Sequence, residues 1–379
     1  MIYQRAGMIP LALIALLASS IALAAEEKLL INVNPYSPRL KHTYRHGVVP
    51  TLEQHKRMHE WVASHQGPQA LTLTTGNHTL SYGGGIDGIG VTSGPPKVYL
   101  VVYGSQWGTQ STAADGTLSF SGDAQGVVPL LERFFNGLGT GGELWSGTMT
   151  QYCDGSQVAA KATRCPSGAA HVKYPSGAVL AGIWYDKSKA SPPSATGNQL
   201  GREAVAAAAH FGNTTAASNR YSQYVILSPP GTTPDGFNTA NGGFCAWHDY
   251  NGDSTLSGGP VTSTVGDIAF TNFPYIPDAG TSCGAGFVNV GSGPLDGVTI
   301  VEGHEYAETI SDQNPAGGWT NQTGDQTFNG EENGDECAWI QSGQPGGAAA
   351  VKMGNGTYPM QATWSNDTNQ CEVAHTIVQ

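Results

Sequence analysis

The stretch Gly303-His304-Glu305-Tyr306-Ala307-Glu308 follows closely on the apolar run Val298–Val301. This order predicts a helix. Residues four positions apart on a helix lie one above the other on the same face. His304 and Glu308 are therefore predicted to point the same way, with Glu305 one step round the helix.

The spacing of these side chains matches the H-E-x-x-H helix of zinc peptidases, in which two metal ligands flank a catalytic carboxylate. Glu308 stands in place of the second histidine. Zinc accepts carboxylate oxygen, so a zinc site is chemically allowed, although H-E-x-x-E alone is a weak motif because glutamate is common on helix surfaces. A third ligand must come from elsewhere. The acid-rich stretch Glu331–Cys337 is the best local candidate, because clustered acids are costly unless they are solvated or bind a cation.

The N-terminus has the features of a secretory signal peptide over residues 1–25: a basic start, an apolar stretch from Met8 to Leu23 and a small-residue site. The apolar stretch is short for a membrane span, so stable membrane insertion is not expected. Removal of residues 1–25 removes Arg5 and leaves 16 Lys and Arg against 29 Asp and Glu, a net charge of −13. An acidic chain without a basic cluster is a poor nucleic-acid binder. The sequence predicts an exported protein, secreted to the extracellular space or the periplasm.

The six cysteines all lie after residue 150, and none forms a C-x-x-C pair. Export favours oxidation, so three disulfides are expected. Pairing of sequence neighbours closes short loops within one domain. It predicts the bonds Cys153–Cys165, Cys245–Cys283 and Cys337–Cys371.

Residues 26–95 differ from the rest of the chain, because they hold six of the eleven histidines and no cysteine. This segment ends in a glycine-rich linker and is a candidate propeptide. From residue 96 to residue 379, strand patterns alternate with helix patterns, which indicates one α/β domain with a mixed sheet. The 52 glycines, about twice the usual share of ~7%, predict long glycine-rich loops. The expected strands are 97–104, 145–153, 178–184, 221–227 and an edge strand at 243–248; the expected helices are 51–64, 127–138, 200–211 and 298–311, with a long loop over 249–294.

Two further side-chain groups leave alternatives open. His248 lies among aromatic residues beside a cysteine, where it could be a ligand, a transition-state donor or a packed core histidine. Asp249, Asn251 and Asp253 have the 1, 3, 5 spacing of a calcium loop, but the glycine and glutamate expected further along such a loop are missing. Calcium and a simple polar turn both remain open there.

Several motifs, in this order along residues 80–375, resemble the plant Exordium, or phosphate-induced, family of extracellular proteins and its secreted bacterial relatives. The G-H-E-x-A-E and E-x-x-D-x-C blocks are the most specific of them. Because Exordium proteins have no well-defined activity, the resemblance implies export and a shared fold more than a reaction. The motifs are Leu80–Gly84, Val98–Gly104, Phe244–His248, Pro274-Tyr275, Gly303–Glu308, Trp319 and Glu332-x-x-Asp335-x-Cys337.

The order of elements also resembles the zincin metallopeptidases, which implies a zincin-like mixed sheet with an active-site helix. In the branch with a glutamate ligand, the third ligand is a Glu followed three residues later by an Asp, and Glu332-x-x-Asp335 has that spacing. The expected function is a secreted zinc-dependent hydrolase acting on a peptide or protein substrate. The implied roles are His304, Glu308 and Glu332 as Zn ligands, Glu305 as general base, Asp335 as the residue that orients a ligand, and His248 as the donor that stabilises the oxyanion.

Two other functions remain open. The protein could be a non-enzymatic extracellular binding protein of the Exordium type, in which the same acids hold a structural cation. It could also be a hydrolase that uses two carboxyl groups without a metal.

Overall fold

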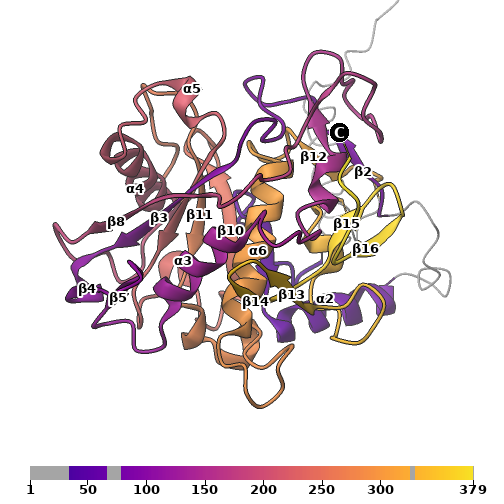
Figure 1. The fold of residues 1–379 in the computed structure, drawn as a ribbon. Helices are drawn as coiled ribbons and strands as arrows, with labels where there is room; N and C mark the ends of the chain where they lie inside the picture. The colour runs from indigo at the N-terminus through magenta and orange to yellow at the C-terminus, as the bar shows by residue number, and fades with distance from the viewer. Residues whose placement is uncertain (1–33, 66–77, 325–328, 379) are drawn as a thin grey trace, which may run out of the picture.

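The computed structural model describes residues 34–65, 78–324 and 329–378. The predicted signal peptide, residues 1–25, lies outside this part. The described chain is a mixed α/β structure built around one six-stranded sheet (Figure 1). No helix within these three ranges is long and apolar enough to cross a membrane.

The central sheet has the strand order β1-β10-β11-β9-β3-β8. Strands β11, β9, β3 and β8 run parallel, whereas β10 is antiparallel to both of its neighbours, β1 and β11. The inner strands β3 and β9 are apolar and almost wholly buried, because helices cover both faces of the sheet. The strands are β1 (His46–Pro50), β3 (Lys97–Tyr103), β8 (Leu180–Asp186), β9 (Ser222–Leu227), β10 (Phe244–Tyr250) and β11 (Ala269–Phe273).

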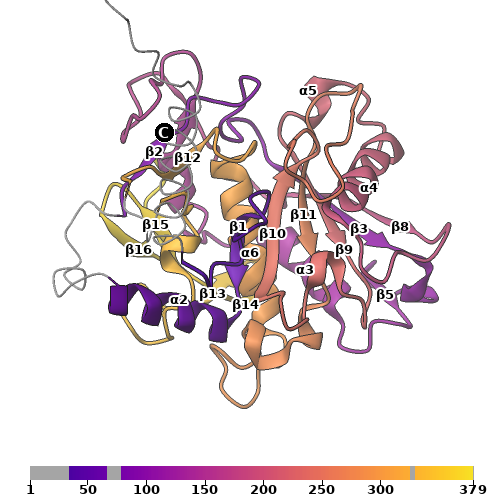
Figure 2. The same cartoon turned by 180° about the vertical axis from the view of Figure 1, so that it is seen from behind.

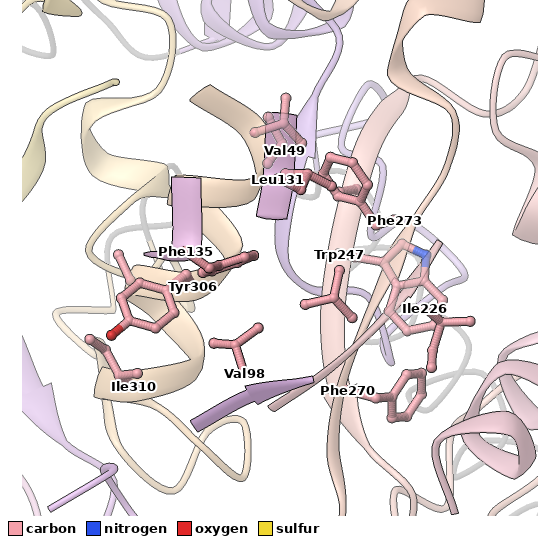
Figure 3. Close-up of a cluster of buried hydrophobic side chains, with 14 of the residues drawn as sticks. Val49, Val98, Leu131, Phe135, Ile226, Trp247, Phe270, Phe273, Tyr306 and Ile310 are labelled. Carbon is pink, nitrogen blue, oxygen red and sulfur yellow. The ribbon is translucent and has the colours of Figure 1, made fainter. Parts of the chain in front are cut away.

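Helices α3 and α6 lie on one face of the sheet and α4 covers the other (Figures 1 and 2). On the first face, Phe135 of α3 packs edge-on against Tyr306 of α6, near Val98 of β3 (Figure 3). On the second face, the next residue of β3, Tyr99, packs against Phe211 at the end of α4, as expected because side chains alternate along a strand. The helices are α2 (Leu52–His65), α3 (Val127–Gly137), α4 (Gly197–His210), α5 (Ala216–Asn219) and α6 (Asp296–Ser311).

Small two-stranded sheets and 3₁₀ turns complete the fold. The pairs are β2 (Leu80–Tyr82) with β12 (Trp319–Asn321), β4 (Gln110–Thr112) with β5 (Leu118–Phe120), β6 (Cys153–Asp154) with β7 (Ala170–His171), β13 (Ala349–Met353) with β14 (Gly356–Met360), and β15 (Thr363–Ser365) with β16 (Gln370–Glu372). The 3₁₀ turns are η1 (Ser105–Trp107), η2 (Thr148–Gln151), η3 (Pro234–Gly236), η4 (Ile276–Asp278), η5 (Gly280–Cys283) and η6 (Asp335–Cys337).

Helix α6 is buried on all sides, although it carries several charged residues. It contacts β10, β1, α3 and the hairpin strand β14. Gly303 permits the close approach of β14, since a Cβ at this position would lie 2.6 Å from the methyl carbon of Met360. A helix with no solvent-facing side normally lacks charged side chains. The charged groups of α6 therefore need partners in the interior, which directs attention to its His-Glu-x-x-Glu segment.

The three predicted disulfides, Cys153–Cys165, Cys245–Cys283 and Cys337–Cys371, are all present. Cys245 lies in β10, and its partner Cys283 lies in the turn before α6. Cys337 ends the acid-rich stretch, and its partner Cys371 lies in β16. Two of the three disulfides therefore fix segments that flank α6.

Three sequence predictions are wrong in detail. Of the strand expected at 145–153, only Cys153 lies in a strand, β6; the rest forms turns and η2, because Thr150 and Gln151 bond their side chains to the carbonyls three residues earlier and so favour a turn. The strand expected at 243–248 is not at the edge, since β1 pairs with it. The loop expected over 249–294 contains β11, whose central Thr271 and Asn272 obscure the apolar pattern of a buried strand.

A buried carboxyl pair on the α4 side of the sheet gives a testable dependence of stability on pH. Burial and the neighbouring Asp186 carboxylate raise the pKa of Glu203 from 4.5 to about 8. The folded state must therefore keep a proton that the unfolded chain releases, and the stability of wild type falls between about pH 4.5 and pH 8. Glutamine mimics the protonated carboxyl at every pH.

Glu203→Gln should accordingly raise the Tm relative to wild type by about 2 °C or more at pH 8, and by much less at pH 4.5. Thermal denaturation of both proteins across this range measures the difference. An equal effect at both pH values would contradict the assignment of the raised pKa to Glu203.

Candidate metal centre

Six titratable side chains from three segments gather at the junction of β10, α6 and the loop before η6. Five of them are fully buried, and the side chain of Asp335 is 11% exposed. The residues are His248 on β10, His304, Glu305 and Glu308 on α6, Glu332 on the loop and Asp335 at the start of η6.

Glu308 is the centre of this cluster. Its Oε2 atom lies 3.0 Å from Nε2 of His304 and 4.0 Å from Nε2 of His248. Neither Glu308 Oε2 nor His304 Nε2 makes a hydrogen bond to any described residue, despite their short separation. Two ligand atoms about 2.0–2.2 Å from one zinc ion would lie roughly 3 Å apart, with both lone pairs directed at the ion. The spacing of this pair fits two ligands of a shared cation, and it equally fits a direct ion pair when His304 is protonated.

Two overlapping sets of donor atoms share Glu308. In the first set, donor atoms of His248, Glu308 and Glu332 all lie within 4.8 Å of one another; in the second, the same holds for His304, Glu308 and Asp335. Nε2 of His248 also lies 3.2 Å from Oε2 of Glu332. The predicted ligands His304 and Glu332 therefore fall in different sets, which Glu308 joins. The residues expected beside the metal, His248 and Asp335, each complete one of these sets.

Hydrogen bonds orient His304 toward the cluster. Its Nδ1 lies 3.1 Å from Oε1 of Gln361. The amide nitrogen of Gln361 donates to the carbonyls of Gly334 and Ala362, so its oxygen is the atom that faces the imidazole. His304 must then carry a proton on Nδ1, so that its neutral form has the lone pair on Nε2, which is the tautomer that a metal ligand requires. The sequence analysis missed Gln361, because no local pattern connects it with a helix 57 positions away.

The acid-rich loop, Glu331–Cys337, also holds the carboxylate of Glu308 in place. Oε1 of Glu308 accepts hydrogen bonds from the backbone N–H groups of Gly334 and Asp335, at 3.1 and 2.9 Å. Asn333 anchors the loop to α6 by donating to Oγ of Ser311. These bonds leave only Oε2 of Glu308 for the cluster. The loop therefore positions the Glu308 carboxylate as well as contributing its own acids.

Burial dominates the electrostatics of the cluster. It raises the pKa of Glu332 and Glu305 well above the ordinary range and also raises that of Glu308, where the Asp335 carboxylate adds to the effect. Burial lowers the pKa of His248 to about 4. Burial also opposes the charged form of His304, but the Glu308 and Asp335 carboxylates outweigh it and raise that pKa. The buried carboxylates lie close together and repel one another when they are ionised. A divalent cation would offset this repulsion.

Glu305 has no hydrogen-bond partner for either carboxylate oxygen among the residues that the structure describes. Glu302, one turn earlier on α6, is equally buried and equally unpartnered. Burying a carboxyl group without partners costs several kcal/mol, so such a group is usually retained for a purpose other than stability. The sequence analysis identified Glu305 from its motif position and missed Glu302, which lies outside the motif.

The strand β1 lies beside β10 and α6 (Figure 2). It pairs with β10 so that His46 lies opposite His248. Between these strands and α6, the backbone of Gly47 passes directly over the cluster: a Cβ there would lie 2.0 Å from Oε2 of Glu308 and 2.6 Å from Nε2 of His248. Only glycine fits at this point, and its φ of +49° is also one that glycine adopts most readily.

The Asp249-Asn251-Asp253 pattern does not form a set of three ligands. Both side-chain amide atoms of Asn251 bond to the backbone, at Val261 and Ile268. His46, Asp249 and Asp253 come together instead, with donor atoms within 4.8 Å. Calcium binding at this place remains a prediction.

Comparison of the chain with models of protein families, with curated proteins and with solved structures finds no match. The resemblances to the Exordium family and to the zincins therefore stay expectations from the sequence motifs.

Proposed function

We propose that this chain is a zinc-dependent hydrolase of zincin-like architecture that cleaves peptide bonds. The observation that carries the proposal is the pair formed by Nε2 of His304 and Oε2 of Glu308. These atoms are 3.0 Å apart, buried, and without a hydrogen bond to the described residues. A buried acceptor left unpartnered costs about 1–3 kcal/mol, and a shared cation would remove that cost for both atoms at once.

His304, Glu308 and Glu332 would hold the zinc. One nitrogen and two oxygen ligands form a donor set that zinc accepts, and three protein ligands leave the fourth position open, as in catalytic sites. Nε2 of His248, 3.2 Å from Oε2 of Glu332, would carry a proton and donate it in a hydrogen bond at the rim of the centre. From there it can also stabilise negative charge on a substrate oxygen.

Zinc, when bound, lowers the pKa of a coordinated water and polarises a carbonyl group. Glu305 would act as the base, because it follows the ligand His304 on α6 and neither of its carboxylate oxygens bonds to another described residue. It takes one proton from the water as the water oxygen bonds to the carbonyl carbon. The carbon–nitrogen bond then breaks, and Glu305 delivers the proton to the departing amine.

A structural cation in a non-enzymatic binding protein is the second candidate. The two donor sets that share Glu308 fit it as well as they fit an enzyme. The unpartnered carboxylate of Glu305 favours the hydrolase, since a purely structural site gains nothing from a buried acid that holds neither the ion nor a neighbour. A hydrolase that uses two carboxyl groups without a metal would not need Nε2 of His304 and Oε2 of Glu308 to face one another.

Metal content tests the proposal before any substrate is known. The purified protein is expected to bind about one zinc per chain by elemental analysis. Saturation at 100 times the Kd should stabilise the fold by about 2.7 kcal/mol, measured as a rise in Tm on adding zinc to chelated protein.

Glu308→Gln should lose this rise, while Glu60→Gln, at an exposed position on α2, should keep it. A protein that binds no zinc, or whose zinc survives Glu308→Gln unchanged, would exclude this centre.

A further inference from the structure

Residues His46–Pro50 form β1, which crosses the proposed centre where a substrate would have to lie, and Tyr44 and Arg45 lead into it. The strand pairs antiparallel with β10, and its Gly47 lies against the side chains of Glu308 and His248. Val48 and Val49 are buried in the groove, with exposed fractions of 5% and 0%. Antiparallel addition of a strand to a sheet edge is a general mode of peptide recognition. β1 thus makes the contacts expected of a bound peptide.

Arg45 fills a side-chain pocket two residues before Gly47. Its guanidinium group is 2% exposed and donates from Nε to Oδ2 of Asp235 and from Nη2 to the carbonyl oxygen of Asp235, both at 2.7 Å. The ring of Phe244 lies 4.4 Å beneath the guanidinium carbon. A carboxylate, a carbonyl and an aromatic face are the groups that select arginine, through paired hydrogen bonds and a cation–π contact.

Nη1 of Arg45 donates to the carbonyl of Pro38, a few residues earlier in the same segment, at 2.9 Å. The other groups that hold Arg45 belong to the body of the protein. Phe244 is part of β10, and Asp235 lies in η3, where its left-handed backbone (φ +51°) directs the carboxylate at Arg45. Oδ1 of Asp235 also accepts a hydrogen bond from the hydroxyl of Tyr44. Without the strand, the Asp235 carboxylate would lose both of these partners and would face the vacated groove.

We propose that Tyr44–Pro50 is a built-in substrate-like strand that blocks the centre, and that the Arg45 pocket selects an arginine side chain in peptides that replace it. This inference rests on the proposed function, because only a hydrolase has a peptide substrate. The pocket and its ligand can nevertheless be tested by binding alone. The expected ligand is an extended peptide with arginine two residues before the position held by Gly47.

The experiment uses the full chain with a recognition sequence for a site-specific protease placed within residues 66–77, cut after folding. Cutting removes the tether that keeps the strand at an effective concentration in the millimolar range, so the segment can be diluted away. The probe is a fluorescent peptide of residues 42–50, and its binding is measured by fluorescence anisotropy.

The cut protein should bind the probe and the uncut protein should not. A probe with R45A should bind about 10- to 100-fold more weakly, the range expected for lost hydrogen bonds to a charged group. Asp235→Asn in the protein should weaken binding of the probe that carries arginine. It should also reduce the difference in affinity between the arginine and alanine probes. Asp278→Asn, an exposed aspartate of the same loop region, serves as the matched control and should retain that difference.

A second measurement avoids the cut. Tyr44→Phe in the intact chain keeps the ring but loses its bond to Asp235, and Arg45→Ala removes the anchor; both should let the probe bind to uncut protein. Equal binding of the arginine and alanine probes, or equal binding to intact wild-type and cut protein, would overturn the inference.

Hydrolysis separates this inference from the proposed function. The cut protein, given a mixed peptide library, should cleave sequences with arginine at one position at least about 10-fold faster than those with alanine there, and Asp235→Asn should reduce that ratio toward one. Arginine-selective binding without hydrolysis would support the pocket and refute the hydrolase. Chelator-sensitive hydrolysis without preference for arginine would support the hydrolase and refute the pocket.

Discussion

Glu305→Gln is expected to abolish peptide hydrolysis while leaving the fold and the bound zinc intact. General-base catalysis contributes about 10²–10⁴-fold to a rate, so the loss in kcat should be of that size. Glutamine is nearly the same shape as glutamate and cannot take the proton. Because neither carboxylate oxygen of Glu305 bonds to a described residue, the change should break no contact in the fold.

Glu302→Gln provides the matched control for this result. Glu302 lies on the same helix, is buried to the same degree and is equally without a hydrogen-bond partner in the described chain. Its substitution should leave kcat within a few-fold of wild type, measured on the same cut protein and the same peptide. Equal losses in both variants would show that any uncharged residue in this part of α6 disturbs activity, and Glu305 would then have no special role.

His304→Ala is expected to cause the largest loss of zinc affinity. It removes a ligand and leaves Glu308 facing a cavity, so zinc affinity should fall well over 100-fold and the rise in Tm with zinc should disappear. Gln361→Ala should cost less. It removes only the group that fixes the His304 tautomer, and such a partner is worth about 10–100-fold in affinity.

Titration with a competing chelator orders these affinities, and Glu60→Gln, at an exposed position on α2, serves as the control. A Gln361→Ala loss as large as that of His304→Ala would argue against the tautomer argument. Unchanged zinc binding in His304→Ala would remove His304 from the ligand set.

The parts of the site that the sequence could predict are those written into local spacing. The face shared by His304 and Glu308 follows from the period of a helix. Glu332 and Asp335 could be placed by their motif, and the structure brings both to α6 through backbone bonds to Glu308. The disulfides were predictable because neighbouring cysteines in an exported chain close short loops.

The parts that escaped prediction depend on contacts between distant segments. Gln361 reaches His304 from beyond a hairpin, and no periodic pattern marks it. β1 is only five residues long and contains Gly47 and Pro50, so its sequence cannot be distinguished from that of a turn. Its position nevertheless decides that β10 is an inner strand and that the proposed centre is covered. The expected boundary near residue 95 depends on the same segment and remains a prediction.

The placement of two disulfides links the chemistry of the centre to the moment at which it becomes complete. Cys245 precedes His248 by three residues, and Cys337 follows Asp335 by two. Each disulfide therefore restrains a segment that carries residues of the cluster. A newly made chain in a reducing compartment has the proposed ligands but lacks these two disulfides. On the proposed function, the chain would reach full activity only after both bonds had formed, because they restrain β10 and the acid-rich loop.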